Sequence, residues 1–240
     1  MNNSIKILGL LAIIMVSSLL IFSVNKEIST DNDEKNTSES YQIKALKLPK
    51  NLNFAGEKVP VKNQDIRERM DRELLVNTYW QSNGLLMFKR AQKYFPIIEP
   101  ILKKNGVPDD FKYLAVIESG LTNAKSPAGA SGVWQIMKST GRELGLEIND
   151  DIDQRYDIEL AAIAACEYLN KAYEKYGNWT LVAASYNLGM GGIENKLGDQ
   201  KVKSYYDLSL NEETGRYVYR ILAIKTLFPI KTLFIAVICT

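Results

Sequence analysis

A series of helix-type segments, separated by glycine and proline, occupies residues 61–228 and most constrains the fold. Apolar side chains in these segments recur at three- and four-residue spacing, as on one face of an α-helix. No stretch shows the alternating pattern of a strand, and no hairpin dipeptide joins two such stretches. We expect an all-α domain with helices at Ile66–Tyr79, Leu85–Phe95, Ile97–Lys104, Pro108–Ser119, Asp157–Tyr176, Trp179–Leu188 and Thr214–Leu227.

Composition removes several kinds of chemistry, because the 240 residues include no histidine. Ser-His-Asp and Cys-His catalysis and histidine-containing zinc sites are therefore excluded. The two cysteines, Cys166 and Cys239, are too few for a structural zinc site, and we expect Cys166 to be a small buried residue. Acid–base work must fall to carboxylates, Lys, Tyr or Cys. We expect no metal and no cofactor.

The charge balance argues against a nucleic-acid partner. Residues 61–228 contain 22 basic and 22 acidic side chains. Binding to nucleic acid without sequence preference requires a basic surface, which a balanced domain does not supply.

Both ends of the chain differ from this central domain. Ile7–Val24 is almost continuously apolar and follows Lys6, so residues 1–24 are expected to be a signal peptide or a membrane anchor. Residues 25–60 are expected to be a polar linker, since most of them are acidic, polar or turn-forming. The pentad Ile224–Phe228 is repeated at Ile230–Phe234, and we interpret residues 229–240 as an aberrant apolar tail.

Glu118 is the candidate catalytic residue. Phe111, Leu114, Ala115 and Glu118 share one helical face, so the carboxyl group lies where a leucine would be expected. Burial and the negative end of the helix dipole both disfavour the carboxylate, which would raise its pKa as a general acid requires. The simpler alternative is a glutamate that bends out to water.

A run of small residues follows, from Ser126 to Gly132, and then Val133-Trp134-Gln135-Ile136-Met137. Small side chains allow a ligand to approach the backbone closely. An aromatic ring, an amide and a thioether could form a sugar-binding wall, whereas ordinary core packing is the alternative for Trp134 and Met137. We expect Gly189–Gly192 to form a tight turn between helices.

Four motifs resemble the soluble lytic transglycosylase domain, and among its members the membrane-bound lytic murein transglycosylases of the D type. They are Glu118-Ser119-Gly120, the segment Ser126–Met137, Ala184-Ser185-Tyr186-Asn187-x-Gly189, and Glu213-Thr214-x-x-Tyr217-Val218. The resemblance implies that residues 61–228 are a lysozyme-like helical catalytic domain. It also implies cleavage of the β-1,4 bond between N-acetylmuramic acid and N-acetylglucosamine, with the muramyl 6-hydroxyl closing on C1 to give a 1,6-anhydro product.

The resemblance assigns roles by motif. Glu118 would be the acid and then the base, and Ser119 would orient it. The substrate-binding residues would be Ser119, Ser126, Gln135, Met137, Tyr186, Asn187 and Tyr217. Glycosidases ordinarily need a second carboxylate, and Asp150, Asp151, Asp153 and Asp157 are available. However, Asp157 can cap the long helix, and a substrate that brings its own hydroxyl nucleophile needs only one carboxyl group.

We therefore expect an exported periplasmic or cell-envelope enzyme that acts on peptidoglycan glycan strands, with residues 7–24 as its contact with the membrane. A lysozyme-type hydrolase and an inert glycan-binding module are the alternatives.

Overall fold

The computed structural model describes residues 46–79 and 81–238. These residues lie in one compact unit that begins at Leu46. The predicted signal or anchor segment and most of the predicted linker lie outside the described residues.

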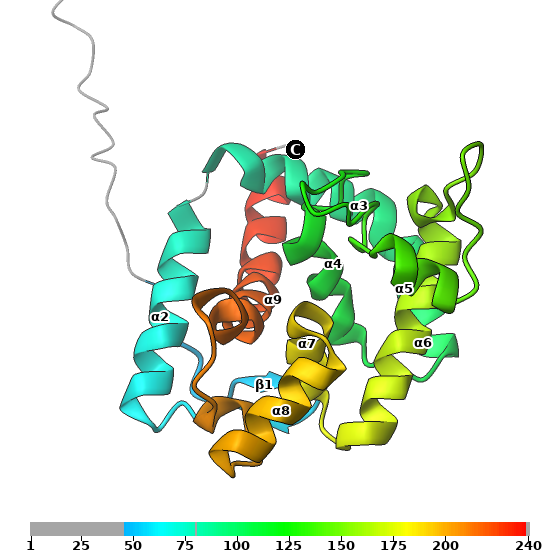
Figure 1. The fold of residues 1–240 in the computed structure, drawn as a ribbon. Helices are drawn as coiled ribbons and strands as arrows, with labels where there is room; N and C mark the ends of the chain where they lie inside the picture. Colours follow the sequence, from blue (N-terminus) through cyan, green and yellow to red (C-terminus); the bar gives the residue numbers. More distant parts are fainter. Residues whose placement is uncertain (1–45, 80, 239–240) are drawn as a thin grey trace, which may run out of the picture. The chain divides into compact units, whose positions relative to one another are not determined.

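The described chain is mostly helical, as the sequence predicts (Figure 1). The α-helices are α2 (Gln64–Tyr79), α3 (Gln81–Lys104), α4 (Lys112–Ser119), α5 (Lys138–Glu143), α6 (Ile158–Tyr176), α7 (Trp179–Leu188), α8 (Met190–Gln200) and α9 (Glu212–Ile238). Single-turn 3₁₀ helices η2, η3 and η4 occupy Asp109–Phe111, Gln154–Tyr156 and Tyr205–Asp207.

Local capping signals explain why α6 and α7 have nearly the predicted bounds. The Asp157 carboxylate accepts hydrogen bonds from the backbone N–H groups of Glu159 and Leu160 at the start of α6. Gly177 ends that helix in the left-handed conformation, and the Asn178 side chain then caps α7.

The expectation of two helices between Leu85 and Lys104 is wrong, because α3 continues through Pro96 and Pro100. Each proline removes one N–H donor from the helix ladder, which usually kinks or ends a helix. Here Ile98 and Leu102 are completely buried on the core-facing side. We attribute the continuity of α3 to this burial, which offsets the lost hydrogen bonds.

Two short helices, α5 and α8, were not expected. Gly189 ends α7 with a positive φ of 82°, but Met190 already begins α8, so Gly191 and Gly192 are helical rather than part of a turn. Glycine is a poor helix former, which is why its run at this position predicts a turn.

Residues 46–60 pack with the helical domain rather than extending it as a linker. The two-residue strands β1 (Asn53–Phe54) and β2 (Glu57–Lys58) form a small antiparallel ribbon. Phe54 is completely buried against Phe111, with ring centroids 5.2 Å apart, and Leu52 and Val59 are also buried. These three apolar side chains are isolated among polar and small residues, so the sequence pattern does not reveal them.

The C-terminal helix is also longer than predicted, since α9 continues through Pro229 to Ile238. Within the described parts of the chain, no helix has the length and apolar character needed to cross a membrane.

Helix α4 lies at the centre of the domain and packs against α3 and α9 (Figure 1). Its side chains Leu114, Ala115 and Val116 are buried, as is Phe111 just before it. Because α4 is fixed on several sides, the residues at its C-terminal end are held in a defined position.

Candidate active site

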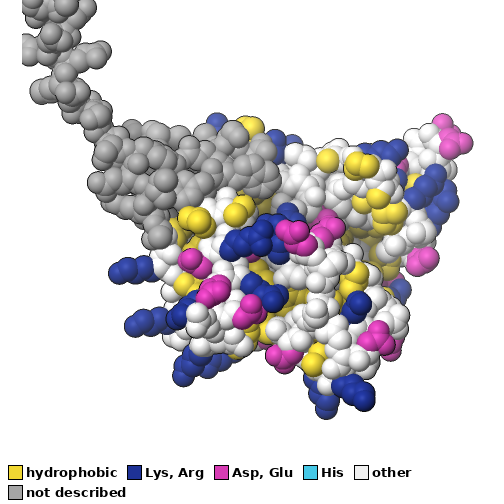
Figure 2. Space-filling view, turned by 60° about the vertical axis from the view of Figure 1, so that its left-hand side comes forward, with side chains coloured by type: hydrophobic (Ala, Val, Ile, Leu, Met, Phe, Trp, Pro, Cys, Tyr) yellow, Lys and Arg dark blue, Asp and Glu magenta, His cyan; other side chains and the backbone are white. Residues whose placement is uncertain are grey.

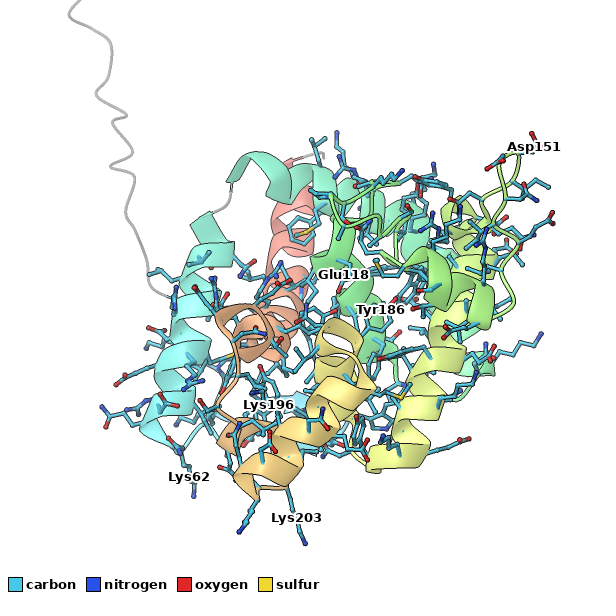
Figure 3. All side chains as sticks on the ribbon, in the orientation of Figure 1. Lys62, Glu118, Asp151, Tyr186, Lys196 and Lys203 are labelled. Carbon is cyan, nitrogen blue, oxygen red and sulfur yellow. The ribbon has the colours of Figure 1, made fainter. Side chains whose placement is uncertain are left out.

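Glu118 lies in the last turn of α4, on the same face as Phe111, Leu114 and Ala115, as the sequence predicts (Figure 3). Gly120 ends the helix in the left-handed conformation with a φ of 60°. The carboxyl group is half-buried beside a cleft and does not bend away into water.

The surroundings of Glu118 suit a group that alternates between acid and base. Burial raises the pKa of the Glu118 carboxyl from 4.5 to about 7, while the Tyr217 hydrogen bond and the Arg220 charge oppose the increase and Glu213 adds to it. A carboxyl group with this pKa has both protonation states populated at neutral pH.

Two tyrosines lie close to Glu118, the candidate catalytic residue. The Tyr217 hydroxyl, from α9, donates a hydrogen bond to Glu118 Oε1 across 99 residues of sequence. Burial and the Glu118 charge hold the pKa of Tyr217 well above 10, so its hydroxyl remains a donor. Tyr186, from α7, lies near Glu118 in Figure 3, and its hydroxyl donates to the Trp134 carbonyl at 2.8 Å.

Asn187 connects α7 to the start of α9. Its Nδ2 donates to Glu213 Oε1 at 3.2 Å, and its Oδ1 accepts from the Thr214 hydroxyl at 2.7 Å. Asn187 therefore holds two residues of the Glu213–Val218 motif beside the Tyr186 helix, and a substrate role for it remains a prediction.

A cleft of about 400 Å³ opens next to Glu118. Asn77, Met87, Arg90, Thr122, Ala124 and Arg220 are among its lining residues. Asn77 and Arg220 also line a second hollow, between α2 and α9, of about 640 Å³. Because the two hollows share these lining residues, they adjoin, and together they are a candidate groove for an extended chain molecule. Figure 2 shows basic and acidic side chains together on one face, with apolar surface in the hollows between them.

Residues 124–137 form a loop that hydrogen bonds hold against α4. The Ser119 hydroxyl donates to the Val133 carbonyl at 2.7 Å and accepts from the Thr122 N–H. These bonds engage Ser119 with the loop, and no hydrogen bond joins its hydroxyl to the Glu118 carboxyl.

Ser126 and Gln135 also make bonds within this loop. Ser126 Oγ accepts from the Ala130 N–H at 3.0 Å and closes a turn. Gln135 has a φ of 50°, and its Nε2 donates to the carbonyls of Gly132 and Ala124 at 2.8 and 3.0 Å. In this structure both side chains stabilise the loop, so any contact with substrate would be additional.

The predicted aromatic wall is wrong for Trp134, whose side chain has no exposed surface and belongs to the core. Met137 is exposed by 42% and precedes α5, so it is the accessible apolar side chain of this segment. Gly132 also does not leave room for a ligand, because a Cβ there would lie 1.9 Å from the Arg155 carbonyl oxygen. A pattern of small residues cannot distinguish space for a ligand from close packing of the chain on itself.

Arg155 also supports the loop, a role that sequence reasoning missed. Its Nη1 donates to the carbonyls of Gly129 and Ile136 at 2.9 and 3.1 Å, while its Nε and Nη2 bind the Asp153 carboxylate. The hydrogen bond from Arg155 lowers the pKa of Asp153. Asp153 is thus paired, Asp157 caps α6, and Asp151 lies at a loop tip far from Glu118 (Figure 3).

Arg90 and Arg220 are further cleft residues that the sequence motifs did not identify. Arg220 lies three residues after Tyr217 on α9, so helical spacing from that motif could have found it. Arg90 is on α3, and no local pattern singles it out.

The fold and the half-buried carboxyl group at the cleft define a lysozyme-like helical domain. The 70 kDa soluble lytic transglycosylase of Escherichia coli has the same fold, with a TM-score of 0.51 and 22% identity, over 69% of this chain and 29% of that one. The expected fold class is confirmed.

Sequence comparisons agree with the fold. Residues 95–209 match the Transglycosylase SLT domain family, and they include the Glu118, Ser126–Met137 and Tyr186-Asn187 motifs. The membrane-bound lytic murein transglycosylase D of Escherichia coli strain K12 is 32% identical over 182 residues, which is 71% of this chain and 39% of that protein. The peptidoglycan transglycosylase gp16 of Escherichia phage T7 is 32% identical over 136 residues, or 54% of this chain and 10% of that protein.

This chain therefore carries a transglycosylase SLT domain. It spans about two fifths of the length of the Escherichia coli relative.

Proposed function

We propose that this domain is a peptidoglycan lytic transglycosylase with Glu118 as its acid–base residue. The observation that carries the proposal is the position of Glu118: a carboxyl group with a pKa of about 7, at a cleft, that accepts a hydrogen bond from Tyr217. The names of the sequence relatives and the matching domain family support the same activity.

The reaction needs one carboxyl group to act twice. Protonated Glu118 gives its proton to the glycosidic oxygen as the bond from the muramyl C1 breaks. The resulting Glu118 carboxylate then takes the proton of the muramyl 6-hydroxyl, whose oxygen closes on C1. The proton balance returns Glu118 to its starting state, and no water is consumed.

Tyr217 is placed to position this group. Its hydroxyl donates to one carboxyl oxygen, which leaves the other oxygen for the substrate. Ser119, Ser126, Gln135, Met137, Tyr186 and Asn187 are the proposed groove residues. Most of these side chains make the hydrogen bonds described above, and we infer that they hold residues 124–137 and the start of α9 in position around the cleft.

A lysozyme-type hydrolase is the main alternative, and the position of Glu213 is the reason to consider it. Hydrolysis with a single glutamate acid requires a second carboxylate to bind or replace water. Glu213 is the described acidic side chain whose charge contributes to the raised pKa of Glu118, and it lines the adjoining groove. Because Asn187 Nδ2 donates a hydrogen bond to the Glu213 carboxylate, this group is less available to activate water. The hydrogen bond therefore favours the transglycosylase reaction over hydrolysis.

The test is digestion of purified sacculi by the wild-type chain and by Glu118→Gln. We expect the wild type to release muropeptides with 1,6-anhydro ends, and Glu118→Gln to bind sacculi without releasing them. Glu213→Gln serves as the control and should retain anhydro products. Release by Glu118→Gln at the wild-type rate would refute the role assigned to Glu118. Binding of sacculi by the wild type without release of any product would instead favour the glycan-binding module.

We also propose that the domain acts in the cell envelope, with residues 7–24 directing export or anchoring it there. The apolar composition of that segment and the peptidoglycan substrate support the proposal. Fractionation of cells expressing the full chain and a form without residues 1–24 tests it, and equal distribution of the two forms would contradict it.

A further inference from the structure

Two arginines from distant parts of the sequence meet at the C-terminal end of α4, next to Glu118. Arg90 Nη1, from α3, donates to the Gly120 carbonyl at 3.2 Å. Arg220 Nη2, from α9, donates to the Ile117 carbonyl at 3.3 Å. Both side chains are half-buried and both line the Glu118 cleft.

These guanidinium groups retain most of their hydrogen-bonding capacity. A guanidinium has five N–H donors, whereas each of these groups makes one hydrogen bond to the described residues, and that bond is to a neutral carbonyl. Neither forms an ion pair with any carboxylate among residues 46–79 and 81–238.

Two other arginines of α2 and α9 behave differently. Arg216 pairs with the buried Glu73 and with Glu212, and Arg72 pairs with Glu212. Arg72 and Arg216 are therefore already paired with carboxylates of the protein, whereas Arg90 and Arg220 are not. A partly desolvated guanidinium with free donors is suited to bind a planar anion such as a carboxylate.

Given the proposed function, the substrate itself can supply that anion. N-acetylglucosamine is neutral, but each muramyl residue carries a lactyl ether. Its carboxyl group is free in a denuded glycan strand, and in an intact strand it is joined to a peptide that has carboxylates of its own. We propose that Arg90 and Arg220 bind a carboxylate carried by the muramyl residue or its peptide, and so select muramyl-containing glycans at this cleft.

A purely structural role is the alternative. Arginines near the end of a helix can bind its last carbonyls and stabilise the negative end of the dipole. Such a role would affect folding, but it would give no preference for glycans that carry carboxylates.

Arg90 is the better residue to test, because it is absent from the groups that shift the pKa of Glu118, whereas Arg220 lowers that pKa. The experiment measures dissociation constants in a Glu118→Gln background, so that ligands are not cleaved. The three ligands are an N-acetylglucosamine oligomer without carboxylates, a denuded muramyl glycan strand, and the same strand with its peptides.

We expect Arg90→Gln to weaken binding of a carboxylate-bearing strand about tenfold or more, the range for a hydrogen bond to a charged group. Binding of the N-acetylglucosamine oligomer should be unchanged. Weaker binding of only the denuded strand would identify the lactyl carboxylate, and weaker binding of only the intact strand would identify a peptide carboxylate. Equal loss for all three ligands, or no loss, would overturn the proposal.

Two further variants make the result specific. Lys89→Gln removes an exposed charge from the adjacent position of α3 and should leave all three dissociation constants unchanged. Arg90→Lys keeps the charge and should retain part of the preference, so a folding defect in Arg90→Gln, detected by its unfolding temperature, does not prevent the test. Failure of the proposed function would show separately, as an absence of products from sacculi with the Arg90 and Glu118 side chains intact.

Discussion

At the residue scale, the burial that raises the pKa of Glu118 also costs stability when the carboxyl group is ionised. Its pKa is about 7 in the folded chain and near 4.5 when the group is exposed. The folded state therefore binds more protons than the unfolded state between these two values. The penalty for ionising the buried carboxyl group is therefore absent below the unfolded pKa. Stability falls as the pH rises, and the penalty is complete above the folded pKa.

We therefore predict that Glu118→Gln is more stable than the wild type above neutral pH. The variant cannot ionise, so it avoids a penalty of up to about 3 kcal/mol. Thermal unfolding should show a higher midpoint for Glu118→Gln at about pH 8 and equal midpoints at about pH 4. A constant difference at both pH values would mean that burial does not raise the pKa of this carboxyl group.

Tyr217 gives a second prediction at this scale. Its hydrogen bond stabilises the Glu118 carboxylate, so Tyr217→Phe should raise the pKa of Glu118 further. The protonated form would then persist to higher pH, so the alkaline limb of the plot of kcat against pH should move to higher pH. We also expect kcat to fall about 10- to 100-fold from lost orientation. Unchanged kcat with an unmoved alkaline limb would exclude this role.

At the element scale, the loop of residues 124–137 depends on close contact with its neighbours. The Gly132 N–H donates to the Ala124 carbonyl at 2.9 Å, and its Cα faces the backbone at Arg155. Two backbone carbonyls of the loop also accept hydrogen bonds from the Ser119 and Tyr186 hydroxyls. Its conformation should therefore control the geometry around Glu118.

Gly132→Ala should destabilise the domain by about 3 kcal/mol or more, because the added Cβ meets a backbone carbonyl and the φ of 77° is unfavourable for alanine. Gly129→Ala is the matched control. It also has a positive φ, but its Cβ would meet no atom within 4 Å, so its cost should be about 1 kcal/mol. Chemical denaturation of both variants measures the difference, and equal losses would contradict this account of Gly132.

Sequence reasoning succeeded at this scale where the signal was local. The bounds of α6 and α7 follow from Asp157, Gly177 and Asn178, which act on their own helices. It failed where tertiary packing decides the outcome, as with the continuous α3 and the buried Trp134. Arg155 and Arg90 were missed because their partners are distant in sequence.

At the scale of the whole molecule, the N-terminal part of the described chain belongs to the helical domain. The Glu57 carboxylate accepts hydrogen bonds from the N–H groups of Trp179 and Thr180 at 2.5 and 2.9 Å, at the start of α7. Asp110 accepts from the Ala55 N–H at 2.6 Å and pairs with Lys225 of α9. Residues 46–60 thus connect α7, η2 and α9.

Removing residues 1–45 should leave the unfolding free energy unchanged, whereas removing residues 1–60 should lower it by several kcal/mol. The second deletion takes away Phe54, whose loss alone should cost about 3–5 kcal/mol. Phe54→Ala in the full chain provides the control for chain length. Equal stability of the two truncated forms would mean that residues 46–60 do not stabilise the domain, and that the domain begins at residue 61.

The central claim is that the muramyl 6-hydroxyl, and not water, attacks C1 after Glu118 protonates the leaving oxygen. The most direct measurement is digestion of sacculi in water enriched in heavy oxygen, followed by mass spectrometry of the muropeptides. We predict 1,6-anhydro ends with no heavy oxygen incorporated. Reducing ends that carry the heavy isotope would contradict the account and identify the domain as a hydrolase.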